Sequence, residues 1–561
     1  MARKDYDTEL TVSKSFLQET TDAEQLQNLG YTQELKRSFS LLSMIGFGFS
    51  ILNCWCALAG SLAEVMLNGG PATLTFGWIG TCVFSICVVV CLAELTSAYP
   101  VAGGQYSWCL MLGEGAKWSR LTSYCCGWIQ ISGLLGVVAV GWYQMGINIT
   151  AMVSLRNPDF TPENWIIALI AYGAGVLALM IDLFGNRMLH YFTATALWWS
   201  LGGFLTCMIT VLACAPSFQS PSFVFTSVNY DSGWNSVGMS VVLGLMQCAF
   251  GMCAYDSVSH MSEEIDDASK QAPRAMVLSV IVGFITGFAF VLALLFVIQD
   301  MDAVVNTPTG FPLAEIFRQA TSSNVGAVCL TLITVITQAF TNISLLSEGS
   351  RSVYAFARDG AFPPFLNKYL GQVSPTLDVP VYGLLFSFIV PAILVTILFG
   401  SATAFFTVLS IAGTGLYVSY TIPIVVVALK RKAKAPGHYN LGKWSLWFQL
   451  PALAYLFFCD IFMFFPTELP VTPANMNYCC VAFGIVAVLA TLSWYGGARH
   501  CYIDQVSVLN GEVIVTESEV VSKRSQDVYE LKKMPSASNT IDNGSSSSDW
   551  YQDRNRPLYH R

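Results

Sequence analysis

Long apolar stretches alternate with short polar segments along most of this chain. A transmembrane helix needs about 20 mostly apolar residues to cross roughly 30 Å of hydrocarbon. Twelve stretches meet this requirement, at residues 40–67, 72–98, 121–152, 164–184, 190–214, 236–259, 275–298, 324–349, 380–400, 403–429, 445–466 and 477–497. The pattern predicts an all-α membrane protein whose twelve transmembrane helices form one domain, residues 40–497.

Polar tails flank this domain at residues 1–39 and 498–561. The C-terminal tail has too few apolar residues to bury a core, so we expect it to be disordered. Cytoplasmic loops of membrane proteins carry an excess of Lys and Arg. With twelve spans, 26 of the 28 Lys and Arg residues fall on the side of the two tails, and only Arg156 and Arg318 fall on the other side. This asymmetry predicts that both termini are cytoplasmic.

The composition agrees with a membrane protein and argues against other classes. Hydrophobic residues make up 54% of the chain and charged residues 11%, whereas soluble domains have about 25% charged residues. No basic face or arm suggests nucleic-acid binding. The five His are scattered, and no hydrolase, phosphate-loop or zinc-protease motif is present. The 17 Cys have neither disulfide nor zinc spacing. We therefore expect no catalytic activity, cofactor or metal.

The first and sixth apolar stretches each contain glycine and polar residues near the middle, where a lipid-facing helix would have Leu. They are five stretches apart, as expected of two inverted repeats of five helices, and many secondary transporters bind solute where two such helices break. Glycine can instead mark close packing between membrane helices. The pattern predicts a substrate site at Gly46, Gly48, Ser50, Asn53 and Trp55 in the first stretch and Phe250, Gly251, Tyr255 and Asp256 in the sixth.

Asp256 is the most informative of these residues, because a carboxylate within a membrane span is costly and usually faces a cavity. Three roles are open to it. It could pair with a cationic substrate, accept a proton that is transported with the substrate, or cap the second half of a broken helix by accepting its free N–H groups.

Other candidate residues have ordinary structural explanations beside the functional one. Glu94, Asp182 and Glu348 lie near predicted cytoplasmic helix ends, where we expect solvation or hydrogen bonds to loop N–H groups. Glu94 is nevertheless a second candidate for proton coupling or gating. Trp55 and Tyr255 adjoin the predicted breaks and could attract an organic cation, although most membrane aromatics belong to interfacial belts.

Five motifs along the chain resemble those of one transporter family: Ala93-Glu-Leu-Thr-Ser-Ala-Tyr-Pro-Val-Ala-Gly-Gly-Gln-Tyr-Ser-Trp108, Ala254-Tyr-Asp256 with Glu263-Glu264 and Pro273, Arg358-Asp-Gly-Ala-Phe-Pro363, Leu29-Gly-Tyr-Thr-Gln-Glu-Leu-Lys-Arg-Ser-Phe-Ser40 and Leu469-Pro-Val-Thr-Pro-Ala-Asn-Met-Asn-Tyr478. The first three resemble signatures of the amino acid–polyamine–organocation (APC) superfamily. The last two look like its fungal choline and GABA permease branch. The resemblance extends from about residue 28 to residue 497.

The resemblance implies a fold and a function. It implies five-plus-five inverted repeats followed by two further helices, with helices one and six broken and the substrate held between them. It also implies proton-driven import across the plasma membrane and an acidic gating residue at Asp256. Amino acid members typically have Gly-x-Gly at the first break. Here Gly46 and Gly48 are present, but Ser50-Ile-Leu-Asn-Cys-Trp55 follows, closer to the Asn-x-Trp of choline-type permeases, which favours an organic cation over an α-amino acid.

The leading hypothesis is therefore a secondary transporter for a small nitrogenous solute, either a choline-like cation or an amino acid such as GABA. Its expected partners are this substrate, protons and the lipid bilayer, and its oligomeric state is open. A transporter-like nutrient receptor that signals through its tails is the main alternative. An integral membrane enzyme is a third, which the lack of a catalytic cluster disfavours.

Overall fold

The computed structural model describes residues 22–60, 62–113, 117–157, 159–430, 437–473 and 475–502. These residues form helices and three isolated backbone bridges, with no strand among them. The longer helices are α6 (Gly70–Ala98), α8 (Lys117–Arg156), α9 (Asn164–Phe184), α10 (Leu189–Cys214), α14 (Ala268–Val297), α17 (Asn324–Arg358), α19 (Val381–Gly400), α21 (Ile411–Lys430), α22 (Ser445–Phe462) and α23 (Cys479–Ser493). The shorter helices are α2 (Asp22–Asn28), α3 (Leu41–Leu52), α4 (Cys54–Gly60), α5 (Leu62–Leu67), α7 (Gln105–Gly113), α11 (Pro221–Thr226), α12 (Val237–Phe250), α13 (Ser257–His260), α15 (Met301–Val305), α16 (Pro312–Thr321), α18 (Pro364–Leu370), α20 (Ala402–Leu409) and α24 (Arg499–Cys501).

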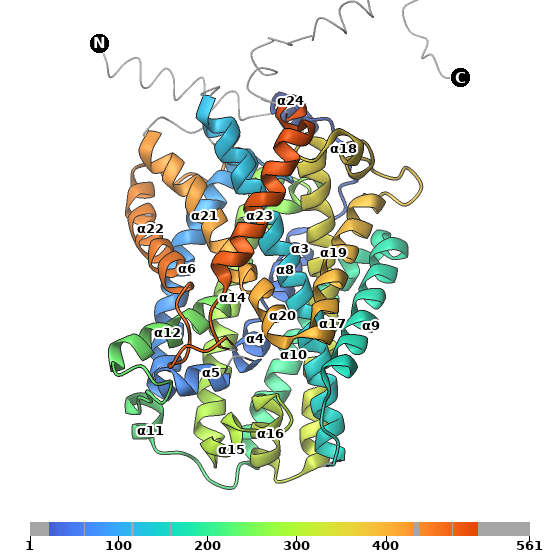
Figure 1. The fold of residues 1–561 in the computed structure, drawn as a ribbon. Helices are drawn as coiled ribbons and strands as arrows, with labels where there is room; N and C mark the ends of the chain where they lie inside the picture. The colour runs from blue at the N-terminus through green and yellow to red at the C-terminus, as the bar shows by residue number, and fades with distance from the viewer. Residues whose placement is uncertain are drawn as a thin grey trace, which may run out of the picture. The chain divides into compact units, whose positions relative to one another are not determined.

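Eleven helical segments in the described residues are long and apolar enough to cross a bilayer. They coincide with eleven of the twelve predicted stretches, so the prediction of an all-helical, multi-pass membrane protein is confirmed. The exception is the predicted stretch 236–259, where α12 is apolar but only 14 residues long. Figure 1 shows the long helices running alongside one another, with α11, α15 and α16 at one end and α18 and α24 at the other.

Side chains next to the helix ends explain where several helices begin. Ser40 and Ser43 form a reciprocal capping box at the start of α3, in which each hydroxyl bonds the other residue's backbone N–H. Ser236 and Ser323 accept a hydrogen bond from a backbone N–H in the first turn of α12 and α17. These caps satisfy donors that have no partner within the helix.

The helices pack closely where small residues meet and expose apolar faces elsewhere. Helix α3 packs on α10 and α14, and α8 packs on α17 and α21. Gly46 on α3 permits the first contact, because a Cβ atom there would lie 2.2 Å from the carbonyl oxygen of Thr193 on α10. Trp198 and Leu492 are each 64% exposed. Such surfaces suit contact with lipid.

Part of the predicted N-terminal tail belongs to the folded body. Leu26, Tyr31, Leu35 and Phe39 are buried, so residues 22–39 pack against the helices. The predicted C-terminal tail lies outside the described residues beyond Tyr502, which is itself buried.

We expect Gly46→Ala to lower the stability of the protein by about 1–3 kcal/mol, because the new methyl group overlaps the α10 backbone. The change in melting temperature of the purified protein in detergent measures this effect. Gly80→Ala on α6 is the matched control, since outside the neighbouring backbone of α6 no atom of the described residues lies within 4 Å of a Cβ atom at Gly80. Equal melting temperatures for the two variants would contradict the proposed close contact.

Candidate functional site

The backbone is interrupted within both of the stretches predicted to break. Asn53 separates α3 from α4 and adopts left-handed angles, with φ 39° and ψ 38°. Asn tolerates this conformation better than most residues. In the sixth stretch, α12 ends at Phe250, and residues 251–256 are irregular before α13 begins. Ala254 within this segment has a φ of 62°.

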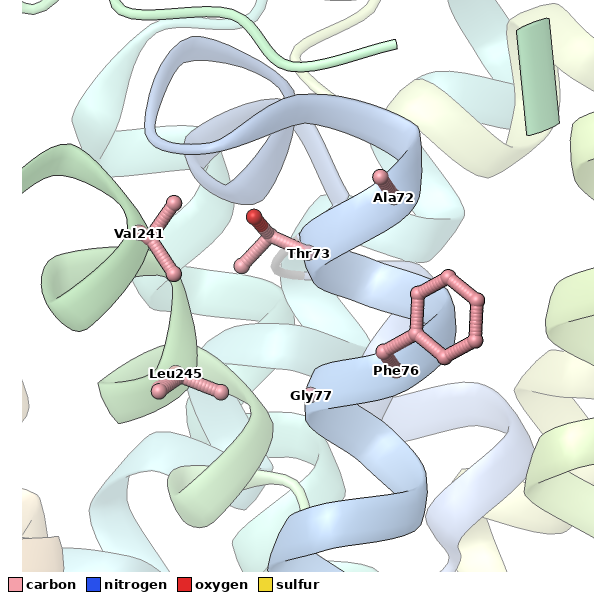
Figure 2. A pocket seen from close by; sticks show the side chains of 6 residues that line it. All are labelled: Ala72, Thr73, Phe76, Gly77, Val241 and Leu245. Carbon is pink, nitrogen blue, oxygen red and sulfur yellow. The ribbon is translucent and has the colours of Figure 1, made fainter. Parts of the chain in front are cut away.

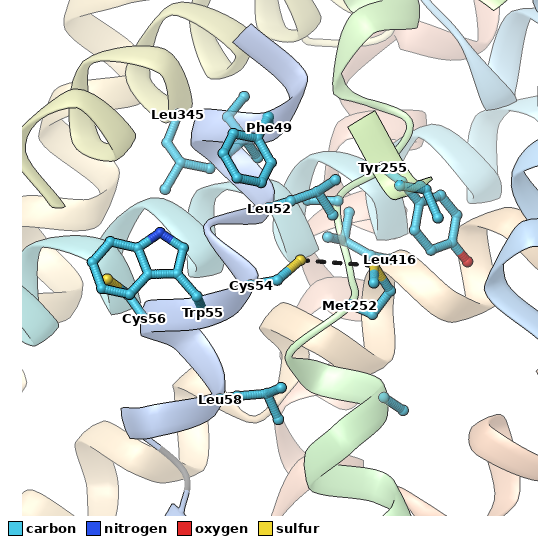
Figure 3. Close-up of a cluster of buried hydrophobic side chains, with 14 of the residues drawn as sticks. Phe49, Leu52, Cys54, Trp55, Cys56, Leu58, Met252, Tyr255, Leu345 and Leu416 are labelled. Atoms are coloured by element: carbon cyan, nitrogen blue, oxygen red, sulfur yellow. Dashed lines mark hydrogen bonds between the residues drawn. The ribbon is translucent and has the colours of Figure 1, made fainter. Parts of the chain in front are cut away.

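The two interruptions contact each other. Cys54 and Met252 approach through their sulfur atoms, which are 3.8 Å apart. Figure 3 shows this contact among buried apolar side chains that include Leu52, Leu58 and Tyr255. The irregular segments are therefore adjacent in the interior of the protein.

Helices α17 and α21 bond the backbone carbonyls at the two breaks. Thr341 on α17 donates its hydroxyl proton to the carbonyl oxygen of Ser50 at 2.7 Å. Tyr417 on α21 donates to the carbonyl oxygen of Ala249 at 2.9 Å. Such partners are needed because a break inside a membrane protein frees polar groups that lipid cannot satisfy.

Polar side chains of α17 line the first break. Asn53 donates through Nδ2 to Oε1 of Gln338 at 3.3 Å, and Ser50 and Ser344 share a hydroxyl hydrogen bond of 2.8 Å. Near this break, the buried atoms Asn53 Oδ1 and Asn342 Nδ2 have no hydrogen-bond partner within the described residues. An unsatisfied acceptor and an unsatisfied donor are costly in a protein interior unless a ligand or water completes them.

Three residues predicted for the substrate site contact neighbouring helices. A Cβ atom at Gly48 would lie 2.7 Å from Oγ of Ser279 on α14, and Gly46 packs against α10, so the close-packing alternative fits both glycines. Trp55 donates through Nε1 to Ser200 on α10 at 2.9 Å, and its ring is 5.2 Å from that of Phe290 on α14.

The remaining predicted residues of the sixth stretch lie at the second break. The ring of Phe250 packs against α21, where a Cβ atom at Gly413 would lie 2.7 Å from it. Gly251 packs against α4, where a Cβ atom at Gly251 would lie 3.2 Å from the side chain of Leu58. The buried ring of Tyr255 is 4.9 Å from that of Tyr420, and its hydroxyl has no partner among the described residues.

Asp256 is fully buried and accepts hydrogen bonds from several helices. Gln105 on α7 donates to its Oδ2 and Tyr420 on α21 donates to its Oδ1, each at 2.5 Å. Nε2 of His260 lies 3.1 Å from Oδ2. The carboxylate makes no capping hydrogen bond to α13, so the capping role has no support in this geometry.

His260 contacts Asp256 in the structure, although in the sequence it is one of five scattered histidines. Its Nδ1 lies 2.9 Å from the carbonyl oxygen of Ala102, which can only accept, so Nδ1 donates. Its Nε2 faces the Asp256 carboxylate, and a neutral imidazole has only one N–H. A direct hydrogen bond between His260 and Asp256 therefore needs one additional proton, either on Nε2 or on the carboxyl group. Nε2 also lies 3.4 Å from the side-chain amide nitrogen of Gln130. The spacing of four residues within a helical segment was the only signal of this pair in the sequence.

Glu348 on α17 is the third member of the group. The expectation of a solvated or loop-bound carboxylate was wrong, because α17 continues to Arg358 and the side chain is 1% exposed. Its Oε2 has no hydrogen-bond partner within the described residues. The side-chain nitrogen or oxygen atoms of Asp256, His260 and Glu348 all lie within 4.8 Å of one another. We call these three residues the Asp256 cluster.

The Asp256 cluster contains atom types that bind divalent metals, but its hydrogen bonds fit protons better. Both nitrogens of His260 and both oxygens of Asp256 already face hydrogen-bond partners. A metal would have to displace these partners, so we do not assign a metal to the group.

The hydrogen bonds of Glu94 go to residues outside the Asp256 cluster. It accepts from the backbone N–H of Leu441 at 3.3 Å and from the hydroxyl of Ser445 at 2.8 Å. This arrangement agrees with the structural explanation given above for Glu94, a carboxylate bonded to a loop N–H group. Asp182 instead accepts from Ser347 on α17 at 2.6 Å.

Two buried ion pairs follow the second break. Arg358 donates to both oxygens of Glu263 at 2.8 and 2.9 Å, and Arg351 donates to Glu264 at 2.7 Å. Burial raises the pKa of Glu263, but the charge and hydrogen bonds of Arg358, the backbone N–H of Ala102 and the charge of Arg37 together hold the pKa below its ordinary value. Burial raises the pKa of Asp359 to about 6, although Arg358 opposes the rise.

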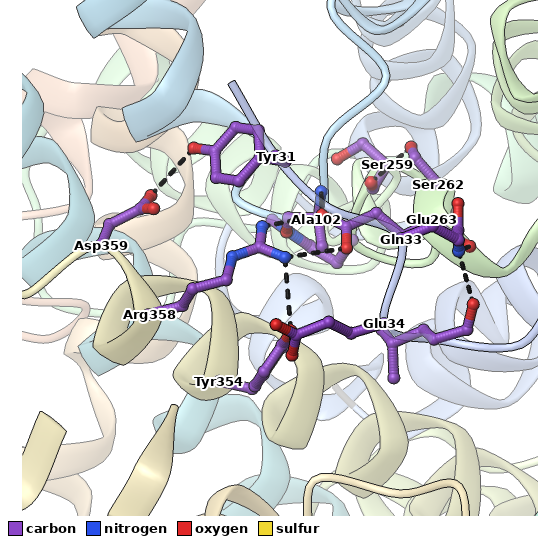
Figure 4. Close-up of polar contacts among 12 residues, drawn as sticks. Tyr31, Gln33, Glu34, Ala102, Ser259, Ser262, Glu263, Tyr354, Arg358 and Asp359 are labelled. Atoms are coloured by element: carbon purple, nitrogen blue, oxygen red, sulfur yellow. Dashed lines mark hydrogen bonds and ion pairs between the residues drawn. The ribbon is translucent and has the colours of Figure 1, made fainter. Parts of the chain in front are cut away.

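The N-terminal segment, residues 31–39, is bound to this charged region (Figure 4). Tyr31 donates to Asp359 at 3.2 Å, and Glu34 accepts from the hydroxyl of Tyr354 at 2.7 Å. The backbone N–H of Phe39 donates to the carbonyl oxygen of Glu264 at 3.1 Å. The segment thus joins the loop after α13 to the end of α17.

An apolar groove between α6 and α12, with a volume of about 330 Å³, lies outside this site (Figure 2). Its lining residues are Ala72, Thr73, Phe76, Gly77, Val241 and Leu245. The hydroxyl of Thr73 donates within its own helix, to Gly69. The groove offers no charged group and contains none of the predicted site residues.

Comparison with known proteins agrees with this architecture. The family model for amino acid permeases matches residues 39–488. A Macrophomina phaseolina protein with the provisional name of an amino acid/polyamine transporter is 43% identical over 78% of this chain and 97% of its own length. The choline transporter of Saccharomyces cerevisiae is 31% identical over 88% of each chain. Amino-acid permease BAT1 of Arabidopsis thaliana is 31% identical over 86% of this chain and 96% of its own.

The fold and these relatives define a membrane transporter rather than an enzyme. The chain belongs to the amino acid permease family of the APC superfamily. The three relatives described above are named as transporters or permeases of amino acids, polyamines or choline.

We expect Arg358→Ala to destabilise the protein by about 3–5 kcal/mol, because it leaves Glu263 buried without its cationic partner. Thermal unfolding in detergent measures the loss. Lys368→Ala is the control, since Lys368 is exposed on α18 and such substitutions change stability by about 0.5 kcal/mol or less. Similar shifts for both variants would show that the ion pair contributes little.

Proposed function

We propose that this protein is a proton-driven secondary transporter that imports a small nitrogenous solute, either a choline-like cation or an amino acid such as GABA. The observation that carries the proposal is the buried Asp256 cluster, in which two carboxyl groups and one imidazole lie together immediately after the second break. Transport of an amino acid or organic cation agrees with the names of the relatives.

We place the substrate between the two breaks. Asn53 Oδ1 and Asn342 Nδ2 are available to bond a polar group of the solute. The faces of Phe250 and Tyr255 suit a quaternary or primary ammonium group. Asp256 is already bonded by three side chains, which favours a gating role over direct pairing with the substrate.

We further propose that α12 and α13 together form the sixth of twelve spans, in five-plus-five repeats followed by two helices. The placement of the two breaks five spans apart supports this arrangement. Both termini are then cytoplasmic, because 26 of the 28 Lys and Arg residues lie on that side. We expect the plasma membrane to be the site of uptake.

Expression in permease-deficient cells tests the function. We expect accumulation of at least one radiolabelled compound from a panel of choline, GABA, polyamines and neutral and basic amino acids. Dissipating the pH gradient and the membrane potential should stop accumulation, and replacing Na⁺ with a large organic cation should not. A strict Na⁺ requirement would refute proton coupling, and binding without accumulation would favour a receptor.

Asn342→Leu tests the placement of the substrate. We expect its KM for the transported compound to rise by about three- to tenfold, because one hydrogen bond to the solute is lost. Thr334→Val is the matched control on α17, since among the described residues the Thr334 hydroxyl bonds to the carbonyl oxygen of Thr331 in its own helix and to no other group. Unchanged KM in Asn342→Leu, at normal surface expression, would exclude Asn342 from the site.

A further inference from the structure

The Asp256 cluster places two buried carboxylates together with only one basic side chain. Asp256 is stabilised by Gln105, Tyr420 and His260, whereas the Oε2 atom of Glu348 has no hydrogen-bond partner within the described residues. Two neighbouring carboxylates in a site that excludes water do not both ionise readily, and the one with fewer donors takes the proton.

No guanidinium is available to neutralise Glu348 in the described part of the chain. Arg351 follows it by one helical turn, but its side chain donates to Glu264 and Asn186. The imidazole of His260 is bonded to Asp256 and Ala102, and its Nε2 also lies 3.4 Å from the amide nitrogen of Gln130. The other groups that face the cluster or adjoin it are uncharged or bonded elsewhere: Cys253, Tyr255, Tyr420, Gln105, Gln130 and, through Ser347, Asp182.

We propose that Glu348, rather than Asp256, is the residue that binds and releases the transported proton. Proton binding converts its carboxylate to a carboxylic acid by forming one O–H bond and needs no other reactant. The proposal rests on the proton coupling proposed above and names the group responsible for it.

The position of Glu348 links this proton to the second break. With one proton shared by Asp256 and His260, the cluster is neutral when Glu348 carries a proton and has one negative charge when it does not. An uncompensated charge is strongly disfavoured in a dry interior. Protonation therefore favours the buried arrangement of α13 against α17, and release of the proton favours its opening to water.

Infrared spectroscopy of the purified protein tests the protonation directly. We expect the C=O stretch of a protonated carboxylic acid in the wild type to lose one component in Glu348→Gln. Asp256→Asn should keep that component at acidic pH, while the pH at which it disappears falls, because a neighbouring negative charge is gone. An identical band in the wild type and Glu348→Gln would overturn the proposal.

Proteoliposomes test the coupling, with radiolabelled choline and GABA as probes and the membrane potential clamped at zero. A pH gradient of one unit then drives about tenfold accumulation for each proton transported. We expect Glu348→Gln to lose this accumulation while its exchange of internal for external substrate stays within about twofold of the wild type. Asp460→Asn is the matched control, a membrane-embedded carboxylate on α22 that is bonded to Thr421.

Two results in this assay would overturn the proposal. Glu348→Gln could accumulate substrate like the wild type, or it could lose exchange and accumulation together without rescue by Glu348→Asp, as expected of a purely structural residue. Failure of the wild type to accumulate either probe on the pH gradient, with exchange intact, would instead refute the proton coupling in the proposed function.

Discussion

A helix that breaks inside a membrane protein exposes backbone groups that lipid cannot bond, and the centre of this protein is organised around that constraint. Helices α17 and α21 satisfy it with side chains. Thr341 bonds the carbonyl of Ser50, and Tyr417 bonds the carbonyl of Ala249. The breaks also cover each other through Cys54 and Met252. Helices far apart in the sequence are thus required for α3 and α12 to end where they do.

The buried charged side chains are subject to the same constraint, because a charge that neither water nor lipid can stabilise needs a partner within the protein. Beyond the second break, Glu263 and Glu264 are each paired with an arginine of α17, and the N-terminal segment packs over them. These pairs are fully compensated and suit a structural or gating role. In the Asp256 cluster the balance is incomplete, because two carboxyl groups lie with one imidazole and the Oε2 atom of Glu348 has no hydrogen-bond partner within the described residues. An incomplete balance can change with one proton, whereas a fully compensated ion pair cannot.

Helix α17 connects the proposed substrate site with the proposed proton site. Asn53 and Asn342 lie at the first break, and Asp256 closes the second. Helix α17 contributes Asn342 and Glu348 to the two regions, and these residues are about two turns apart along one helix. A rigid helix that contacts both regions provides a physical connection between a solute at the breaks and a proton at Glu348.

Patterns in the sequence alone predicted the class of protein, most of the spans and the positions of the two breaks. Apolar length is a property of each segment alone, and glycine and polar residues within it mark where a helix is weak. Motif resemblance then identified the family. The sequence did not predict the environment of individual polar residues. Glu348 was assigned to a helix end because the predicted span stopped at residue 349, whereas α17 continues to Arg358. Gln105 and Tyr420 come from α7 and α21, so only tertiary packing brought them to Asp256, whereas His260 lies four residues along the same segment. Gly46, Gly48 and Trp55 likewise proved to contact α10 and α14. The sequence could not predict this, because the face of a helix that meets a neighbour depends on which helix packs beside it.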